Sequence, residues 1–177
     1  MRIIRPLRTI GKKITGALVA GLLASTLAAT IFSGSASAQP AGGTEHFTII
    51  TTSPTGPSPV IATGAFHAVG TETETPTSDT SAVATFVFPN GTFKVSRTDN
   101  PGGPGSFNAI ACVGHFSGTG TYVIVPGSGT GAFTSISGYG TYSARGTMVA
   151  GHTPSGCTPY PVALFVVGRA SGPVSFS

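Results

Sequence analysis

The chain has 177 residues, with nine Lys and Arg against five Asp and Glu and a formal net charge of +4. Five of the cations precede residue 14, so residues 39–177 carry four Lys and Arg against five acids, a net charge of −1. Nucleic acids and anionic membranes are bound by clustered cations, and the sequence therefore predicts neither as a partner.

A secretory signal peptide is predicted over residues 1–38. A cationic start without acids precedes an apolar, uncharged run over residues 14–32, and Ala36 and Ala38 occupy the two small positions that a signal peptidase reads. We expect cleavage after Ala38, secretion of the mature chain and no stable membrane span in it. An uncleaved anchor is the alternative, because the run is somewhat long for a signal peptide, although its Gly, Ser and Thr residues weaken it as a permanent span.

Residues 39–177 are predicted to form a single domain, because about 140 residues suffice for one hydrophobic core. This part contains ten Phe, one Leu, one Met and no Trp, and Val, Ile, Thr, Phe and Tyr dominate its larger side chains. Such side chains suit a pleated sheet better than a helix. The near-zero net charge and the apolar content also argue against disorder.

Alternating and apolar runs predict about eight β-strands in this domain. The expected strands are residues 45–52, 60–71, 82–88, 92–98, 107–117, 121–125, 139–149 and 162–170. Asn90-Gly91 between two alternating runs indicates a hairpin. Polar loops are expected over residues 71–80, with Glu72 and Glu74 in water, and over residues 100–106. No segment after residue 38 keeps a 3.6-residue period, so no long helix is expected.

We expect the strands to close into one antiparallel β-barrel rather than an open sheet or a two-sheet sandwich. Strands 107–117 and 162–170 carry apolar residues on both faces, whereas a water-exposed antiparallel sheet would alternate more cleanly. No helix is expected to cover an apolar outer face. The outside of the barrel is therefore predicted to form an interface between copies of the chain, as a homo-oligomer.

A short pattern recurs in the second half of the domain. Gly118-Thr-Gly-Thr-Tyr122 is repeated twenty residues later as Gly138-Tyr-Gly-Thr-Tyr142, with a turn-rich connection over residues 126–131. The repeat favours a hairpin of two similar strands, and similarity of composition alone is the alternative.

The whole stretch 118–142, GTGTYVIVPGSGTGAFTSISGYGTY, resembles the hallmark region of the allene oxide cyclase-like and dirigent β-barrel superfamily. The order of its motifs is similar to that in secreted actinobacterial members, and the resemblance covers residues 66–172. It implies an eight-stranded antiparallel, calycin-like barrel, often with an internal apolar cavity. The active-site carboxylate and water-binding residues of that family have no match here, so no catalytic residue is carried over.

Two cysteines, Cys112 in the middle of an expected strand and Cys157 in a loop over residues 151–161, are predicted to form a disulfide. Pairing is the usual state of two cysteines in an exported protein. Two free thiols are one alternative, and a zinc site completed by His115 and His152 is another. Residues three apart on a strand, such as Cys112 and His115, point to opposite faces, which argues against zinc. No metal and no cofactor are expected.

The sequence contains no catalytic motif. There is no Gly-x-Ser-x-Gly elbow, and the glycine tract over residues 127–131 is not followed by the helix that a phosphate site needs. The candidate ligand-binding residues are polar groups that continue apolar strand faces, namely Arg97, Asp99, His115 and Arg169. The alternative is that Arg97, Asp99 and Arg169 lie at strand ends and extend to water at the rim.

Together these features predict a secreted, non-catalytic β-barrel that binds a small apolar molecule. A cyclase-like or dirigent-like enzyme is one alternative, because a shaped cavity can steer a reactive intermediate with few catalytic groups. A cell-surface interaction protein, with a hydroxyl-rich outside as its contact surface, is the other.

Overall fold

The computed structural model describes residues 42–177 apart from residues 54, 102 and 104, and the predicted signal peptide lies outside the described residues. The elements in chain order are β1 (Gly43–Thr51), β2 (Ser58–Gly64), β3 (Ala68–Ser78), β4 (Ser81–Phe88), β5 (Gly91–Asp99), β6 (Gly105–Asn108), β7 (Val113–Ile124), the 3-10 helix η1 (Gly131–Phe133), β8 (Ile136–Thr153) and β9 (Gly156–Phe176). The predicted all-β class is confirmed.

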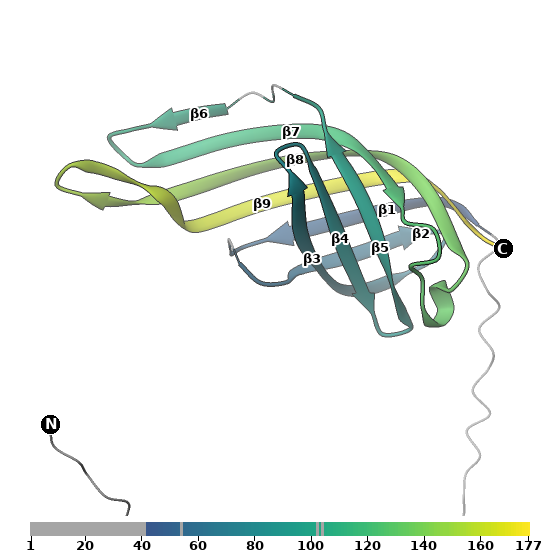
Figure 1. Ribbon diagram of the computed structural model, residues 1–177. Coiled ribbons are helices and arrows are strands. Elements are labelled where there is room, and N and C mark those ends of the chain that lie inside the picture. Colours follow the sequence, from purple (N-terminus) through teal and green to yellow (C-terminus); the bar gives the residue numbers. More distant parts are fainter. Residues whose placement is uncertain (1–41, 54, 102, 104) are drawn as a thin grey trace, which may run out of the picture. The chain divides into compact units, whose positions relative to one another are not determined.

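Eight of the strands close into an antiparallel barrel, as predicted (Figure 1). Around the barrel they follow the order β1, β2, β3, β4, β5, β7, β8 and β9, and β9 pairs back onto β1 from Gly43↔Val174 to Thr51↔Val166. The short strand β6 lies outside this ring and pairs with the beginning of β7. The Asn90-Gly91 hairpin joins β4 to β5 as expected.

Two segments near the N-terminal end of the domain differ from the prediction. Residues 60–71 form parts of two strands, β2 and β3, which are joined by a turn at residues 65–67. Residues 71–80, predicted as a loop, continue β3 as far as Ser78 and pair with β4. The polar composition of this segment was misleading, because Thr is a good strand former and polar side chains suit a strand with one face in water.

Two later segments also differ. Residues 107–117 span β6, a turn and the start of β7, and Cys112 lies in that turn with a φ of 54°, not in mid-strand. Strands β8 and β9 are 18 and 21 residues long and form one hairpin, so Cys157 lies in β9 rather than in a loop. Glycine and proline in residues 151–161 thus mark the hairpin tip and a strand edge, not a long loop.

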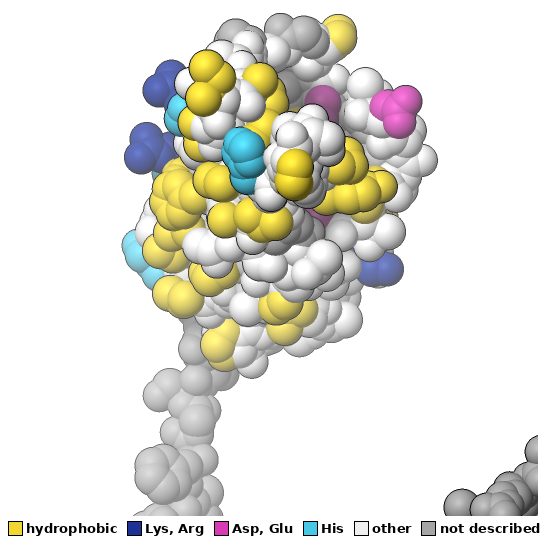
Figure 2. Space-filling model, turned by 90° about the vertical axis from the view of Figure 1, so that its left-hand side faces the viewer, with side chains coloured by type: hydrophobic (Ala, Val, Ile, Leu, Met, Phe, Trp, Pro, Cys, Tyr) yellow, Lys and Arg dark blue, Asp and Glu magenta, His cyan; other side chains and the backbone are white. Residues whose placement is uncertain are grey.

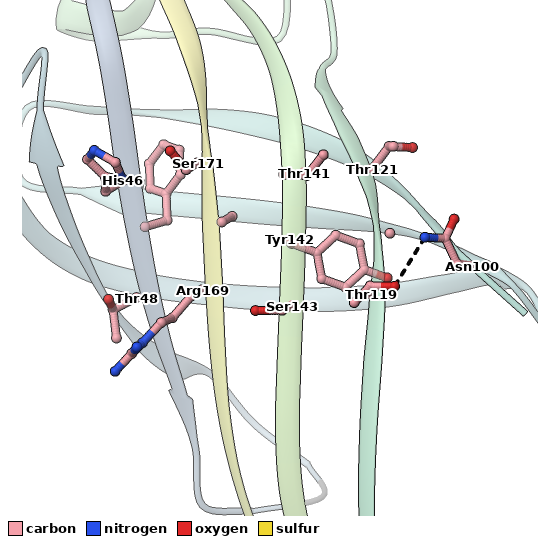
Figure 3. A pocket seen from close by; sticks show the side chains of 13 residues that line it. His46, Thr48, Asn100, Thr119, Thr121, Thr141, Tyr142, Ser143, Arg169 and Ser171 are labelled. Atoms are coloured by element: carbon pink, nitrogen blue, oxygen red, sulfur yellow. Dashed lines mark hydrogen bonds between the residues drawn. The ribbon is translucent and has the colours of Figure 1, made fainter. Parts of the chain in front are cut away.

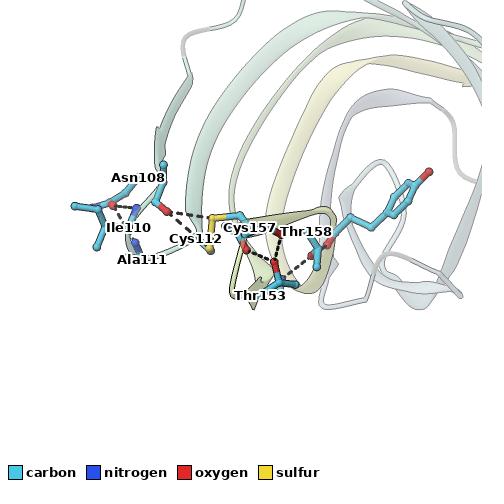
Figure 4. Close-up of a disulfide and its surroundings, with 12 residues drawn as sticks. Asn108, Ile110, Ala111, Cys112, Thr153, Cys157 and Thr158 are labelled. Carbon is cyan, nitrogen blue, oxygen red and sulfur yellow. Dashed lines mark hydrogen bonds between the residues drawn. A yellow bond between two sulfur atoms is a disulfide. The ribbon is translucent and has the colours of Figure 1, made fainter.

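The ends of β8 and β9, with β6 and the start of β7, extend beyond the barrel as an arm (Figure 1). The predicted disulfide is confirmed: Cys112 and Cys157 are bonded, with their Cα atoms 5.5 Å apart, which fixes the β6–β7 turn to the hairpin (Figure 4). The bond excludes the free-thiol and zinc alternatives for these residues. Pro159 and Pro161 lie where β9 pairs only with β8, and proline disfavours pairing of such an edge with another chain.

Several apolar side chains are exposed on the arm and the nearby barrel wall. Viewed from the side of the arm, apolar side chains cover much of the surface (Figure 2). Ile110 is 89% exposed, Tyr160 78% and Val162 69%. The interface between copies that the sequence predicts would draw on such side chains, and it stays a prediction.

Phenylalanines fill one end of the barrel. Phe86 on β4 and Phe93 on β5 stack with ring centroids 5.3 Å apart. The β2–β3 turn contributes Phe66 and η1 contributes Phe133, and these two rings lie 5.0 Å apart. The remaining rings of this cluster are those of Phe47, Phe88, Phe176 and Tyr122. The aromatic core therefore closes one half of the interior and leaves the other half to a cavity.

Candidate functional site

The open half of the barrel contains a cavity of about 800 Å³. Rings of the aromatic core, Phe47 and Phe86, form its floor, and Ser53, Thr55 and Gly56 between β1 and β2 also line it. One side of the wall is apolar and includes Ile49 on β1 and Leu164 and Val166 on β9. Cavities of this size, with an apolar lining and a few polar groups, are typical of small-molecule sites.

Arg97 on β5 is the centre of the polar side of the cavity. Its Nε and Nη2 donate to the two carboxylate oxygens of Glu74, at 2.6 and 2.7 Å. Its Nη1 donates to Asp99 and, at 3.0 Å, to the hydroxyl of Tyr142, which in turn donates to Asp99. Four of the five guanidinium N–H donors are thus used within the protein. Hydrogen bonding to Glu74 raises the pKa of Arg97, which keeps its charge.

Small residues allow these side chains to meet. Strand β4 lies between β3 and β5, and its inward residues at this level are Ala82 and Ala84, so no bulky side chain separates Glu74 from Arg97. Gly120 on β7 pairs with both Asp99 and Tyr142. A Cβ at Gly120 would lie 2.5 Å from a ring carbon of Tyr142, so only glycine leaves room for that ring to reach Asp99.

The repeated sequence pattern has the same physical basis. Tyr122 on β7 pairs with Gly140 on β8, and a Cβ at Gly140 would lie 2.7 Å from its ring. Each copy of the repeat therefore supplies one glycine and one tyrosine to the inner face, and each tyrosine lies over the glycine of the other strand. The hairpin that the repeat favoured is the β7–β8 pair.

Glu72 on β3 is the second polar feature of the cavity. Its side chain lines the cavity, the residue is only 7% exposed, and no hydrogen bond to its carboxyl group is present within the described residues. Burial, and then the charge of Glu74, raise the pKa of Glu72 to about 7, although Arg97 partly opposes the shift. Glu72 is therefore a buried carboxyl group that changes charge near neutral pH.

A further buried acid, Glu45, lies in the closed half of the barrel. The residue is fully buried, and its Oε2 accepts a hydrogen bond of 2.9 Å from the backbone N–H of Phe66. Burial raises its pKa. In the described part of the chain, neither its Oε1 nor the hydroxyl of Tyr122 has a hydrogen-bond partner. Burial, and then the charge of Glu45, raise the pKa of Tyr122 to about 12.

The four candidate residues from the sequence separate into two pairs. Arg97 and Asp99 lie together at the cavity. Arg169 belongs to the stretch of β9 that borders the cavity, but its side chain is exposed on the outer face, and His115 is exposed where β7 pairs with β6. His115 Nδ1 lies 3.0 Å from the hydroxyl oxygen of Thr147. Arg169 lies beside Thr48 in a shallow outer groove rich in Ser and Thr hydroxyls (Figure 3).

Sequence reasoning missed Glu72, Glu74 and Tyr142. The two glutamates were expected in a solvated loop, and the structure corrects this: they belong to β3, and Glu72 is buried. The alternation Thr71-Glu-Thr-Glu-Thr75 was the available signal, because residues two apart on a strand share one face. Nothing comparable marked Tyr142 apart from its place in the repeat.

No protein-family model, no curated protein and no solved structure matches this chain. The barrel is shown by the structure, and the resemblance to the allene oxide cyclase-like and dirigent superfamily stays a prediction. Within the described ranges, no helix is long and apolar enough to cross a membrane. No group of three or more His, Cys, Asp or Glu side chains in the same part of the chain is arranged to hold a metal ion.

Proposed function

We propose that this chain is a secreted β-barrel protein that binds a small, largely apolar molecule in its internal cavity. The observation that carries the proposal is the unequal filling of the barrel. Phenylalanines fill one half, while the other half is a cavity of about 800 Å³ with an apolar wall and one polar cluster. An apolar ligand would bury its surface against Ile49, Leu164 and Val166, and the polar cluster would orient it.

Two features support secretion. The order of cationic start, apolar run and small residues over residues 1–38 is typical of a signal peptide. The Cys112–Cys157 disulfide agrees with an oxidising compartment, because disulfides persist outside the cytoplasm and are rare within it.

A cyclase-like or dirigent-like enzyme is the second candidate, and Glu72 is the observation that favours it. A general acid or base works best when its pKa is close to the ambient pH, and the pKa of Glu72 is raised to about 7 at the cavity wall. The Arg97, Asp99 and Tyr142 cluster could stabilise charge that develops on a bound intermediate. Turnover of a bound ligand, lost in Glu72→Gln, would distinguish the enzyme from a binding protein.

Binding can be tested with a neutral apolar fluorophore, N-phenyl-1-naphthylamine, titrated into the secreted protein. Ala144→Phe on β8 fills part of the cavity, whereas Ser143→Phe adds the same ring to the outer face of the same strand. We expect saturable 1:1 binding that is lost in Ala144→Phe and kept in Ser143→Phe. Absence of saturable binding to the unaltered protein, or binding that Ala144→Phe leaves unchanged while the variant keeps its β-sheet circular dichroism, would contradict the proposal.

A further inference from the structure

The polar side of the cavity has an excess of negative charge. Three carboxyl groups, Glu72, Glu74 and Asp99, face one guanidinium, that of Arg97. The cluster therefore carries a net charge of −2 when Glu72 is ionised and −1 when Glu72 is protonated. Arg169 on β9 also borders the cavity, but its side chain is exposed on the outer face beside Thr48 and does not contribute to this cluster (Figure 3).

The cluster also has more free hydrogen-bond acceptors than free donors. Glu74, Asp99 and Tyr142 already use four of the five N–H donors of Arg97. An anionic ligand would find one guanidinium N–H and three carboxyl groups that repel it. Glu72, in contrast, is 7% exposed, lines the cavity and has no donor among the described residues. Its carboxyl oxygens are open to the cavity, and partial desolvation makes their charge costly, so a ligand that brings N–H donors and a positive charge reduces that cost.

We propose that the ligand is an apolar amine whose protonated amino group binds the carboxylate of Glu72. This inference rests on the proposed function, since it names the class of molecule that the cavity takes. An ammonium group brings a positive charge and N–H donors, and hydrogen bonds between two charged groups are stronger than neutral ones. Glu74 and Asp99 add attraction at longer range, and the Arg97–Glu74 pair remains intact.

The rest of the cavity fits the apolar part of such a molecule. Glu72 lies on β3, and Leu164 and Val166 lie on β9, with β2 and β1 between these strands in the barrel wall. An amine held at Glu72 therefore extends its hydrocarbon part toward Ile49, Leu164 and Val166. The aromatic rings of Phe47 and Phe86 form the floor. A rigid, ring-containing amine buries more surface at a lower entropic cost than a flexible chain does.

Amine binding should depend on pH in a defined direction. The ionised form of Glu72 binds the ammonium group, so affinity rises as the pH increases through the range in which Glu72 loses its proton. The other titratable or charged groups that face this position are Glu74 on the same strand, Arg97 and Asp99 on β5 and Tyr142 on β8. Glu74 opposes the ionisation of Glu72, while the bound ammonium group favours it.

Three probes with one ring system test the inference: 1-naphthylmethylamine, 1-naphthalenemethanol and 1-naphthoic acid. Their dissociation constants are measured by isothermal titration calorimetry at about pH 8. We expect the amine to bind roughly tenfold or more tightly than the alcohol, and the acid to bind most weakly. Glu72→Gln should weaken amine binding to the level of the alcohol and leave the alcohol unchanged. Asp79→Asn, which removes the same charge from an exposed turn, should change none of the three.

The outcomes separate this inference from the proposed function. Equal affinity for amine and alcohol, tightest binding of the acid, or amine binding that Glu72→Gln does not weaken would each overturn the amine assignment while leaving the cavity as a binding site. Failure of all three probes to bind the unaltered protein would overturn the proposed function, and the amine assignment with it.

Discussion

Replacing Glu72 with Gln should stabilise the barrel above neutral pH. Folding moves this carboxyl group from water to a nearly buried position, and burial and the charge of Glu74 raise its pKa from 4.5 to about 7. The folded protein therefore binds this proton more tightly than the unfolded chain does. Stability is then lost as the pH rises from about 4.5 to about 7, and the loss is complete above that range. Gln is neutral throughout, so the variant escapes this loss.

The size of the effect follows from the pKa difference. One pKa unit corresponds to about 1.4 kcal/mol, so a shift from 4.5 to about 7 lowers the free energy of unfolding by about 3 kcal/mol at alkaline pH. In a domain of this size, such a change moves the midpoint of thermal unfolding by roughly 10 °C. Below pH 4.5 the carboxyl group is protonated in both states, and the two proteins should differ little.

Urea unfolding at closely spaced pH values, with the disulfide intact, measures this difference. We expect the gap between Glu72→Gln and the unaltered protein to open between pH 5 and 7.5. Asp79→Asn is the matched control, because it makes the same change at an exposed turn and should follow the unaltered protein. Parallel pH profiles for Glu72→Gln and the unaltered protein would refute the reasoning. Glu74→Gln should shift the titration of Glu72 to lower pH, because the charge of Glu74 raises the pKa of Glu72.

Three further outcomes are expected. Intact-mass measurement of the secreted protein should give a chain that begins at Gln39; a species that keeps residues 1–38 would favour an anchor. The double substitution of Cys112 and Cys157 by Ala should lower the free energy of unfolding by about 4 kcal/mol, because the disulfide closes a loop with a sequence separation of 45. Unchanged urea unfolding of this variant would contradict the expectation. Gly140→Ala should destabilise the protein by about 1–3 kcal/mol, because its Cβ would lie 2.7 Å from the ring of Tyr122 and 2.2 Å from a backbone oxygen of β9. An unchanged thermal midpoint would contradict this and would show that both the ring and the β9 backbone shift to make room.

Much of the fold could be predicted because it depends on local patterns. The Asn90-Gly91 turn, the alternation in β4 and β5 and the preference of Val, Thr and Phe for strands all act over a few residues. The strand boundaries at residues 71–80 and 107–117 were wrong for a different reason. Their pairing partners lie on other strands, and pairing extended β3 to Ser78 and turned the chain at Cys112.

The candidate site was only half predictable. Arg97 and Asp99 could be found because they continue the apolar face of Phe93 and Val95. The direction of a strand face is decided by register and closure, and β7 and β9 have apolar residues on both faces. Sequence alone therefore could not separate Arg97 and Asp99, which face the cavity, from His115 and Arg169, which face outward. The partners of Arg97 are distant in sequence, and Glu74 was assigned to a loop.

The loss of stability that the buried carboxyl group of Glu72 causes is connected with the proposed ligand binding. In the empty barrel this carboxyl group lowers the free energy of unfolding by about 3 kcal/mol at alkaline pH, and a neutral side chain would avoid that loss. Residues that reduce stability are often kept where a ligand needs them. An amine present at about 100 times its dissociation constant stabilises the folded state by about 2.7 kcal/mol. Saturation with 1-naphthylmethylamine at about pH 8 should therefore bring the unaltered protein close to the stability of ligand-free Glu72→Gln, as measured by urea unfolding. If the amine stabilised both proteins equally, the loss of stability at Glu72 would have a cause other than ligand binding.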